Sequence, residues 1–250
     1  MIDLHSHVLP GIDDGAANLE EALAMCRAAA ADGIEVLAAT PHVRHDHPTT
    51  PARMEAALAT LRDAAGDTVR LEPGGELDLA ELDRPAAELR RFGLGGNAGY
   101  LLVETPYHGW QLDIAVRLDR LHADGITPVL AHPERNPDVQ GRPALLAPLV
   151  ESGALVQVTA ASVDGRLGRA PQRCFRRLLD EHLVHLIASD AHAPTVRAIG
   201  LAAAARAVGD SRLADWLTEG VPGAIVEGAT VPPRPPVGRS RRWWSLGAER

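Results

Sequence analysis

The first fourteen residues of the chain, MIDLHSHVLPGIDD, contain two histidines and three aspartates. Ile2, Leu4 and Val8, which flank the histidines, are typical strand residues. On a strand, His5 and His7 point to the same face, because successive side chains alternate between faces. Two imidazoles held side by side are unfavourable without a partner, since they titrate alike. The pattern therefore predicts a metal site where this strand ends.

Histidine and carboxylate side chains also follow the later predicted strands. A single histidine after a strand is more often a hydrogen-bonded structural residue, but here six strands present such groups at the same end. If the strands are parallel in a barrel, these ends meet on one rim, where the active sites of such folds lie. The nine candidate ligands are His5, His7, Asp14, His42, Glu76, Glu104, His132, Asp190 and His192.

These donors are oxygen and nitrogen atoms without sulfur, which favours Mn²⁺, Fe or Zn²⁺. Nine donors are too many for one ion, so two or three divalent ions are expected. Paired metal ions support phosphoryl or acyl transfer to water. Arg135 in HPER and Arg197 after SDAH carry guanidinium groups that match phosphate oxygens. The sequence thus favours metal-dependent hydrolysis of a phosphoester, with Arg135 and Arg197 holding the phosphate.

Short apolar runs alternate with amphipathic segments such as NLEEALAMCRAAAADG and WQLDIAVRLDRLHADG. The near-continuous apolar runs predict parallel strands covered by helices, and seven repeats fit a closed or distorted barrel better than an open sheet. Residues 1–228 are expected to form this unit, and the Pro/Arg/Trp-rich residues 229–250 an extended, flexible tail. The predicted strands are Ile2–His7, Glu35–Ala39, Val69–Glu72, Tyr100–Glu104, Pro128–Ala131, Leu155–Val158 and His185–Ala188.

Composition excludes several classes of function. The 250 residues carry a net charge of −8, which argues against a nucleic-acid-binding surface. No apolar run approaches the ~18 residues of a membrane span, and no signal peptide is evident, so a cytoplasmic protein without membrane insertion is expected. All 25 basic residues are arginine, which excludes lysine Schiff-base chemistry. Neither Cys26 nor Cys174 has an arginine six residues later, which excludes the cysteine-dependent phosphatase mechanism.

The motifs HSH, DDG, TPH, AHPER and ASDAH, with a glutamate near residue 76, together resemble the polymerase-and-histidinol-phosphatase (PHP) superfamily. More narrowly, MIDLHSHVLPGIDDG, GITPVLAHPER and LVHLIASDAH resemble the bacterial manganese-dependent protein-tyrosine phosphatases of capsule and exopolysaccharide operons. The resemblance runs from Met1 to about Arg197. It implies an α/β fold, a distorted (β/α)7 barrel of the PHP type, with a trinuclear metal centre.

The resemblance also implies roles for the candidate residues. Glu76 would bridge two ions, and Arg135 and Arg197 would grip the phosphate. The ions would be manganese, with iron or zinc as alternatives. The first ion would be held by His5, His7, Glu76 and Asp190, the second by Glu76, Glu104 and His132, and the third by Asp14, His42 and His192.

The implied substrate is a phosphotyrosine protein, namely a bacterial tyrosine kinase that regulates capsule or exopolysaccharide synthesis. Two alternatives remain open at this point. One is a small-molecule phosphatase of the histidinol-phosphate type, and the other is a regulatory barrel without catalysis. Short loops favour the protein substrate, because a small metabolite would need an enclosing pocket. The sequence leaves the general acid, the oligomeric state and the role of the tail undetermined.

Overall fold

The computed structural model describes residues 1–195 and 197–236. Its strands pair in two sheets, and all pairs are parallel except β3 with β4. The smaller sheet has the order β1-β2-β5, with β1 at Ile2–Asp3, β2 at Val36–Ala39 and β5 at Arg70–Pro73. The larger has the order β10-β9-β8-β7-β6-β3-β4, formed by β3 (His42–Arg44), β4 (His47–Pro48), β6 (Glu76–Leu77), β7 (Tyr100–Glu104), β8 (Thr127–Ala131), β9 (Leu155–Thr159) and β10 (Leu186–Ala188).

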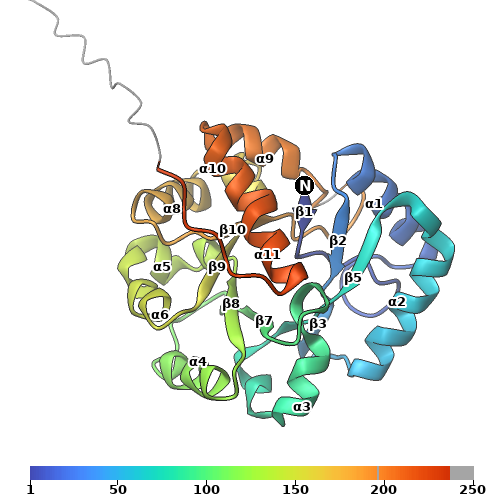
Figure 1. Ribbon diagram of the computed structural model, residues 1–250, viewed down its shortest axis with the longest axis horizontal. Coiled ribbons are helices and arrows are strands. Elements are labelled where there is room, and N and C mark those ends of the chain that lie inside the picture. Colours follow the sequence, from blue (N-terminus) through green and yellow to red (C-terminus); the bar gives the residue numbers. More distant parts are fainter. Residues whose placement is uncertain (196, 237–250) are drawn as a thin grey trace, which may run out of the picture.

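Helices surround the strands, as Figure 1 shows. Short 3₁₀ turns connect several of them, among them η3 (Arg90–Phe92), η5 (Pro133–Arg135) and η6 (Pro143–Leu145), and a π-helical turn, η7 (Trp216–Gly220), precedes the last helix. The α-helices are α1 (Leu19–Ala31), α2 (Pro51–Ala65), α3 (Ala86–Leu89), α4 (Ile114–Ala123), α5 (Pro137–Gly141), α6 (Ala147–Glu151), α7 (Ala160–Val163), α8 (Arg169–Asp180), α9 (Leu201–Val208), α10 (Ser211–Asp215) and α11 (Val221–Glu227).

Local sequence explains where the two longest helices begin. The Asn18 side chain accepts a hydrogen bond from the Glu21 amide, which caps α1. Thr50 caps α2 in the same way, and Pro51 occupies the first turn, where its missing N–H costs nothing. Strand β9 is buried along its whole length, and β7 and β8 are buried after their first residue. Burial on both faces is the reason that these strands read as continuous apolar runs.

The prediction of an α/β fold with parallel strands is confirmed. The seven predicted strands correspond to β1, β2, β5, β7, β8, β9 and β10. Within the described residues the pairing is divided into two sheets, because β2 and β5 are interrupted before β3 and β6 begin. The interruptions fall at Thr40–Pro41 and Gly74–Gly75, and a proline donates no hydrogen bond to a ladder while glycine weakens a strand. These residues also explain why β3 and β6 were not predicted.

The first part of the predicted tail lies against the body of the protein. Trp216 donates a hydrogen bond from Nε1 to the Pro232 carbonyl over 2.9 Å, and Arg234 donates to the Leu179 carbonyl over 2.9 Å. Val231 packs against the core. The remainder of that predicted tail, residues 237–250, lies outside the described residues. Every helix that the structure describes is too short or too polar to cross a bilayer.

Candidate metal centre

The nine candidate ligands come together where the parallel strands end. Strands β7 and β8 lead into Glu104 and His132, β1 leads into His5 and His7, and β10 leads into Asp190. Asp14 is the most accessible of the nine, with a side chain 42% exposed. The other eight are at most 5% exposed, and they are His5, His7, His42, Glu76, Glu104, His132, Asp190 and His192.

Glu76 lies at the centre of the cluster. Its Oε2 atom is 3.3 Å from His5 Nε2 and 3.3 Å from His7 Nε2. The same oxygen is 2.9 Å from His42 Nδ1, and Oε1 is 2.8 Å from His132 Nε2. One carboxylate therefore faces two imidazoles that follow β1, one that follows β8 and one from the first residue of β3, which is a suitable position for a bridging ligand.

The cluster divides into four overlapping groups, in each of which one ligand atom per member lies within 4.8 Å of the others. Glu76 belongs to two of them. Glu104 and His132, which were expected to share an ion, fall in separate groups that both contain Glu76. The groups are His7, Asp14, His42 and His192; His5, His7 and Asp190; His5, Glu76 and His132; and His42, Glu76 and Glu104.

The spacing and the chemistry of the donors fit divalent cations. Asp190 Oδ1 lies 3.5 Å from His5 Nε2 and 3.4 Å from His7 Nε2. Donors that share an ion at about 2.1 Å lie roughly 3.0–3.4 Å apart, so little movement would be needed. In addition, the buried atoms Glu76 Oε2 and His42 Nδ1, although 2.9 Å apart, form no hydrogen bond with each other or with any other described residue. Buried polar atoms without a partner are costly, and a cation would satisfy both.

Electrostatics at the centre lead to the same conclusion. Burial would raise the pKa of Glu76, but His5 and His42 hold that pKa well below its ordinary value. For Glu104, burial and then the charge of Glu76 raise the pKa, and Arg44 offsets only part of the increase. Two neighbouring buried carboxyls thus resist ionising together without added positive charge. A divalent ion supplies that charge.

Two further residues orient the first pair of histidines. His7 donates from Nδ1 to Asp13 over 2.8 Å, and His5 donates from Nδ1 to the Gln157 side-chain oxygen over 3.0 Å. Each contact leaves Nε2 free to face the centre of the cluster. Asp13 belongs to the DDG motif but had no predicted role, and Gln157 was not predicted from the sequence. The available clue was a single amide side chain inside the buried run LVQVT.

The predicted phosphate-binding arginines reach the centre through one shared partner. Arg135 contacts Asp190 Oδ2 at 2.5 Å. Arg197 lies 3.3 Å from Asp190 Oδ1, and its NH2 donates to His192 Nε2 over 2.6 Å. The structure therefore brings Arg135 and Arg197 to the rim, on the same side as the aspartate. Both guanidinium groups are partly accessible, at 17% and 29% side-chain exposure, so they are open to an anion from solvent.

Two other rim residues were not singled out from sequence. Arg44 donates to Glu104 over 3.1 Å. The Tyr107 ring stacks at 5.8 Å on His132, and the Arg135 guanidinium lies 5.1 Å from the centre of the tyrosine ring. Burial raises the pKa of Tyr107 to about 12, so its hydroxyl keeps its proton at neutral pH. An aromatic wall and a third arginine thus border the centre.

Backbone strain is concentrated at the site. His132, Asp190 and Arg197 have φ values of 40°, 53° and 51°, in the left-handed region. Such conformations cost about 1–3 kcal/mol each and persist where surrounding contacts fix them. The His132 amide donates to the Gln157 carbonyl over 2.9 Å, and the Asp190 amide donates to the His5 carbonyl over 2.8 Å. These bonds hold the two ligands in place.

The two cysteines take no part in the centre. Cys26 and Cys174 are buried and unpaired. Burial raises their pKa to about 11 and about 12, respectively, which keeps both thiols protonated and unreactive.

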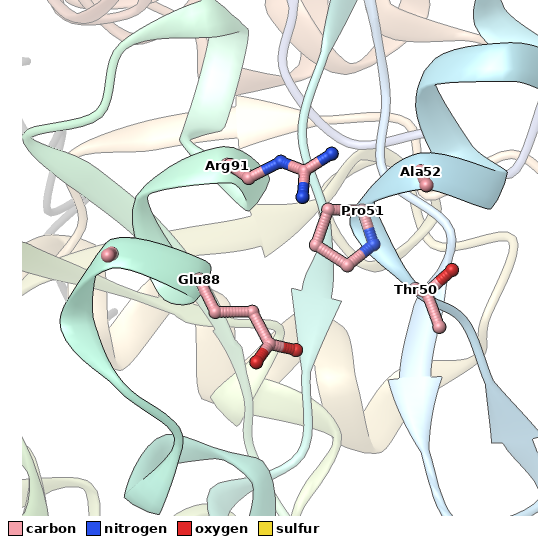
Figure 2. Close-up of a pocket in the computed structure, with 6 residues that line it drawn as sticks. Thr50, Pro51, Ala52, Glu88 and Arg91 are labelled. Atoms are coloured by element: carbon pink, nitrogen blue, oxygen red, sulfur yellow. The ribbon is translucent and has the colours of Figure 1, made fainter.

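A hollow of about 480 Å³ lies apart from the cluster, between the start of α2 and the α3–η3 segment. Figure 2 shows Arg91 and Glu88 on one wall and Thr50 and Pro51 on the other. None of the nine candidate ligands lines this hollow. Arg91 is already paired with Glu55 at 2.7 Å, so its positive charge is compensated within the protein.

Comparison with known proteins places this arrangement in context. The family model for capsular polysaccharide synthesis, CpsB/CapC, matches residues 1–217. The chain is 35% identical over 197 residues to the tyrosine-protein phosphatase YwqE of Bacillus subtilis (strain 168), covering 77% of each protein. It is 29% identical over 203 residues to the putative tyrosine-protein phosphatase CapC of Staphylococcus aureus, covering 79% of each.

The structure is similar to one solved in crystallographic work on YwqE from Bacillus subtilis and CpsB from Streptococcus pneumoniae, described as unique metal-dependent tyrosine phosphatases. The TM-score is 0.84 at 29% sequence identity, and the match covers 96% of this chain and 100% of the other. The family match over residues 1–217 includes all nine candidate ligands.

Proposed function

The chain belongs to the capsular polysaccharide synthesis family CpsB/CapC, and from this membership we propose that the cluster around Glu76 is the active site of a metal-dependent tyrosine-protein phosphatase. The enzyme hydrolyses phosphotyrosine in proteins. The observation that carries the proposal is the convergence of eight buried histidine and carboxylate side chains and the accessible Asp14 on one rim.

The two sheets together are proposed to form a distorted (β/α)7 barrel. The chain continues from β2 into β3 and from β5 into β6, so each pair counts as one bent strand. A parallel bridge between Ser6 and Ala191 links the strands that begin with β1 and β10, and the His7 amide donates to the Ala191 carbonyl over 2.8 Å. These contacts support a ring of seven strands whose carboxyl ends surround the cluster.

We assign all nine ligands to two or three divalent ions, with manganese as the first candidate and iron or zinc as alternatives. Bound there, such ions would neutralise the phosphate, polarise the ester and activate water. Glu76 would bridge two ions, because both of its oxygens face imidazoles. The first ion would take His5, His7, Glu76 and Asp190, the second Glu76, Glu104 and His132, and the third Asp14, His42 and His192.

The remaining rim residues would bind and orient the substrate. Arg135 and Arg197 would exchange their contacts with Asp190 for the non-bridging phosphate oxygens, where charge-assisted hydrogen bonds are strongest. Tyr107 would lie beside the substrate ring as part of an aromatic wall. Asp13 and Gln157 would keep His7 and His5 in the tautomers that present Nε2 to the centre.

The protein substrate is proposed to be a tyrosine kinase of capsule or exopolysaccharide synthesis. This step is based on the family, whose description names capsular polysaccharide synthesis. Residues 1–228 would form the catalytic unit and residues 229–250 an appendage. The contacts of Trp216 with Pro232 and of Arg234 with Leu179 would fix where that appendage leaves the barrel.

A substrate panel with metal analysis tests the proposal. We expect purified protein to retain divalent ions and to hydrolyse a phosphotyrosine peptide far faster than histidinol phosphate. Chelation should abolish hydrolysis, whereas alkylation of the buried thiols Cys26 and Cys174 should leave it intact. Activity that survives a chelator but is lost on alkylation would contradict the proposal.

A further inference from the structure

The segment between β7 and α4 exposes an unusual amount of apolar surface. Leu112 is 97% exposed, Val116 on the first turns of α4 is 55% exposed, and Tyr107 is 37% exposed. These are three of the five large hydrophobic side chains that are exposed among the described residues. Isolated exposed apolar residues are normal, but a cluster of them indicates a surface that binds something.

A groove of about 450 Å³ lies against this segment. One wall is formed by Trp110 and Leu112 with the start of α4, and the other by η6 and α6. Figure 1 shows α4 and α6 as neighbours on the same side of the molecule. Leu145 and Leu149 make the second wall apolar, and Arg142 stands at the edge. The groove therefore suits an apolar side chain.

The same segment borders the metal centre. Tyr107 stacks on His132 and lies under the Arg135 guanidinium. Asn136, the residue after Arg135, donates from its side-chain amide to the Pro106 carbonyl over 2.6 Å and to the Gly109 carbonyl over 3.3 Å. The turn that carries His132 and Arg135 and the apolar segment are thus fixed to one another.

The length of the chain limits the distance between the catalytic rim, which Tyr107 borders, and the groove. Tyr107 is three residues from Trp110 and five residues from Leu112, which both line the groove, so its Cα atom lies at most about 11 Å and about 18 Å from theirs. An extended substrate peptide advances about 3.3 Å per residue. A peptide whose phosphotyrosine enters the rim would therefore reach the groove about three to five residues away.

We propose that this groove is a specificity site that binds an apolar side chain of the protein substrate, three to five residues from its phosphotyrosine. The inference rests on the proposed function, because it needs a phosphotyrosine at the rim. Continuity with the catalytic rim is what favours a substrate segment over another occupant. The hollow of Figure 2 is lined by none of the candidate ligands.

The test uses metal-loaded enzyme of full length and a set of phosphotyrosine peptides. Each peptide carries one leucine at a position from three to five residues before or after the phosphotyrosine, in an otherwise glycine- and serine-based chain. Each kcat/KM is divided by that for p-nitrophenyl phosphate, which is too small to reach the groove. We expect one leucine position to raise this ratio about tenfold, mainly through KM, as partial burial of one leucine allows.

Two variants test whether the leucine preference depends on the groove. Leu112→Ser should remove the leucine preference, and because Leu112 is 97% exposed the change should leave folding intact. Leu19→Ser is the matched control, since Leu19 is exposed on α1 outside the groove, and it should keep the preference.

The possible failures are distinguishable. If phosphotyrosine peptides are hydrolysed but no leucine position matters, or if Leu112→Ser keeps the preference, the groove has no such role and the proposed function stands. If no phosphotyrosine peptide is hydrolysed by metal-loaded enzyme, the proposed function itself fails. If Leu112→Ser instead turns a dimer into a monomer in light scattering without changing any preference, the groove binds a second copy, and the inference is overturned.

Discussion

The two ends of the parallel strands have opposite chemical character. At the carboxyl ends, eight imidazole and carboxylate side chains are almost completely buried around Glu76. At the amino ends, η7 and α11 pack against β1 and β10 with apolar side chains, and Leu217, Val221 and Ile225 are fully buried there. Gly223 on α11 faces the Ile2 side chain of β1, so this helix lies against the amino end of that strand.

This difference separates the residues that could carry out the chemistry, at the rim, from the residues that stabilise the fold, at the amino ends of the strands. The strained residues His132, Asp190 and Arg197 lie at the rim, together with the buried atoms Glu76 Oε2 and His42 Nδ1, which have no hydrogen-bond partner among the described residues and would be satisfied by a cation. The amino end contributes apolar burial, which stabilises the fold without any ligand. We therefore expect substitutions at the rim to change activity and metal binding, and substitutions at the amino end to change the free energy of unfolding.

Glu76→Gln should have the largest effect. The amide keeps the shape of the side chain but loses the charge and one acceptor oxygen that would bridge two ions. We expect kcat/KM for a phosphotyrosine peptide to fall at least about 1,000-fold. Metal content should fall with it, measured by elemental analysis of the purified variant.

The stability of the metal-free protein is a separate measurement for this variant. Without metal, Glu76→Gln should unfold at a lower temperature than the parent, because His5 and His42, which hold the pKa of Glu76 well below its ordinary value, lose the buried charge that they face. Glu55→Gln, on the surface in an exposed pair with Arg91, is the matched control and should leave kcat/KM unchanged. A Glu76→Gln enzyme with more than a tenth of the parent activity would show that this residue is not a bridging ligand.

Ile225→Ala tests the opposite end. Truncating this fully buried side chain should lower the free energy of unfolding by about 3 kcal/mol, through lost burial and the cavity left behind. Activity per folded molecule should stay within twofold of the parent. Denaturant unfolding of metal-free protein measures the first quantity and kcat/KM the second.

The exposed residue Val116 supplies the control for this truncation. Val116→Ala on α4 should change the free energy of unfolding by no more than about 0.5 kcal/mol. A large loss of activity in folded Ile225→Ala would mean that the two ends are coupled, and the separation described above would be wrong.

The amino-acid sequence predicted most of the strands and all of the candidate ligands, for different reasons. Seven strands were predicted because buried parallel strands are continuous apolar runs. All nine candidate ligands, brought together in the structure, were selected because charged and imidazole residues lie at or beyond the carboxyl ends of those runs. The short strands β3 and β6 were missed because proline and glycine precede them.

The residues that sequence did not identify act through long-range contacts. Gln157 is an uncharged residue within a strand, and only the fold places it against His5, 152 positions earlier. Tyr107 and Asn136 gain their roles from stacking and side-chain-to-backbone hydrogen bonds between separate strand ends. Local periodicity carries no information about such contacts. The bridge between Ser6 and Ala191, which links the two sheets, is another such long-range contact. No local sequence pattern predicts it.

Arg135→Lys should have an intermediate effect at the rim. Lysine keeps the positive charge but loses the planar pair of donors and the stacking on Tyr107. We expect kcat/KM to fall about 100-fold with little change in thermal stability. Arg91→Lys, an exposed surface exchange, should change neither quantity. Full activity in Arg135→Lys would mean that charge alone, without bidentate geometry, serves the phosphate.

The smallest expected effect concerns His185, a titratable residue at the amino end. Burial, and secondarily the charge of Arg234, lowers the pKa of His185 to about 4. The neutral ring accepts a hydrogen bond at Nδ1 from the Val156 amide over 3.1 Å. In the unfolded chain the pKa returns to about 6.5, so between pH 6.5 and 4 the unfolded state binds more protons. The free energy of unfolding should therefore fall as the pH is lowered through this range.

For this residue alone, the loss between pH 7 and pH 5 amounts to about 2 kcal/mol. His185→Asn retains an acceptor for the Val156 amide but does not titrate, so the variant should lose about 2 kcal/mol less than the parent over that interval. Arg234→Gln should recover a smaller part, because it removes only the secondary cause of the lowered pKa. Denaturant unfolding of metal-free protein at each pH isolates the effect from loss of metal at the rim.

The pH profile of kcat/KM should be the same in the parent and in both variants, because His185 lies at the amino ends of the strands, away from the rim. If the variants lose stability with pH as steeply as the parent does, His185 is charged in the folded protein, and the amino end is less apolar than its burial indicates.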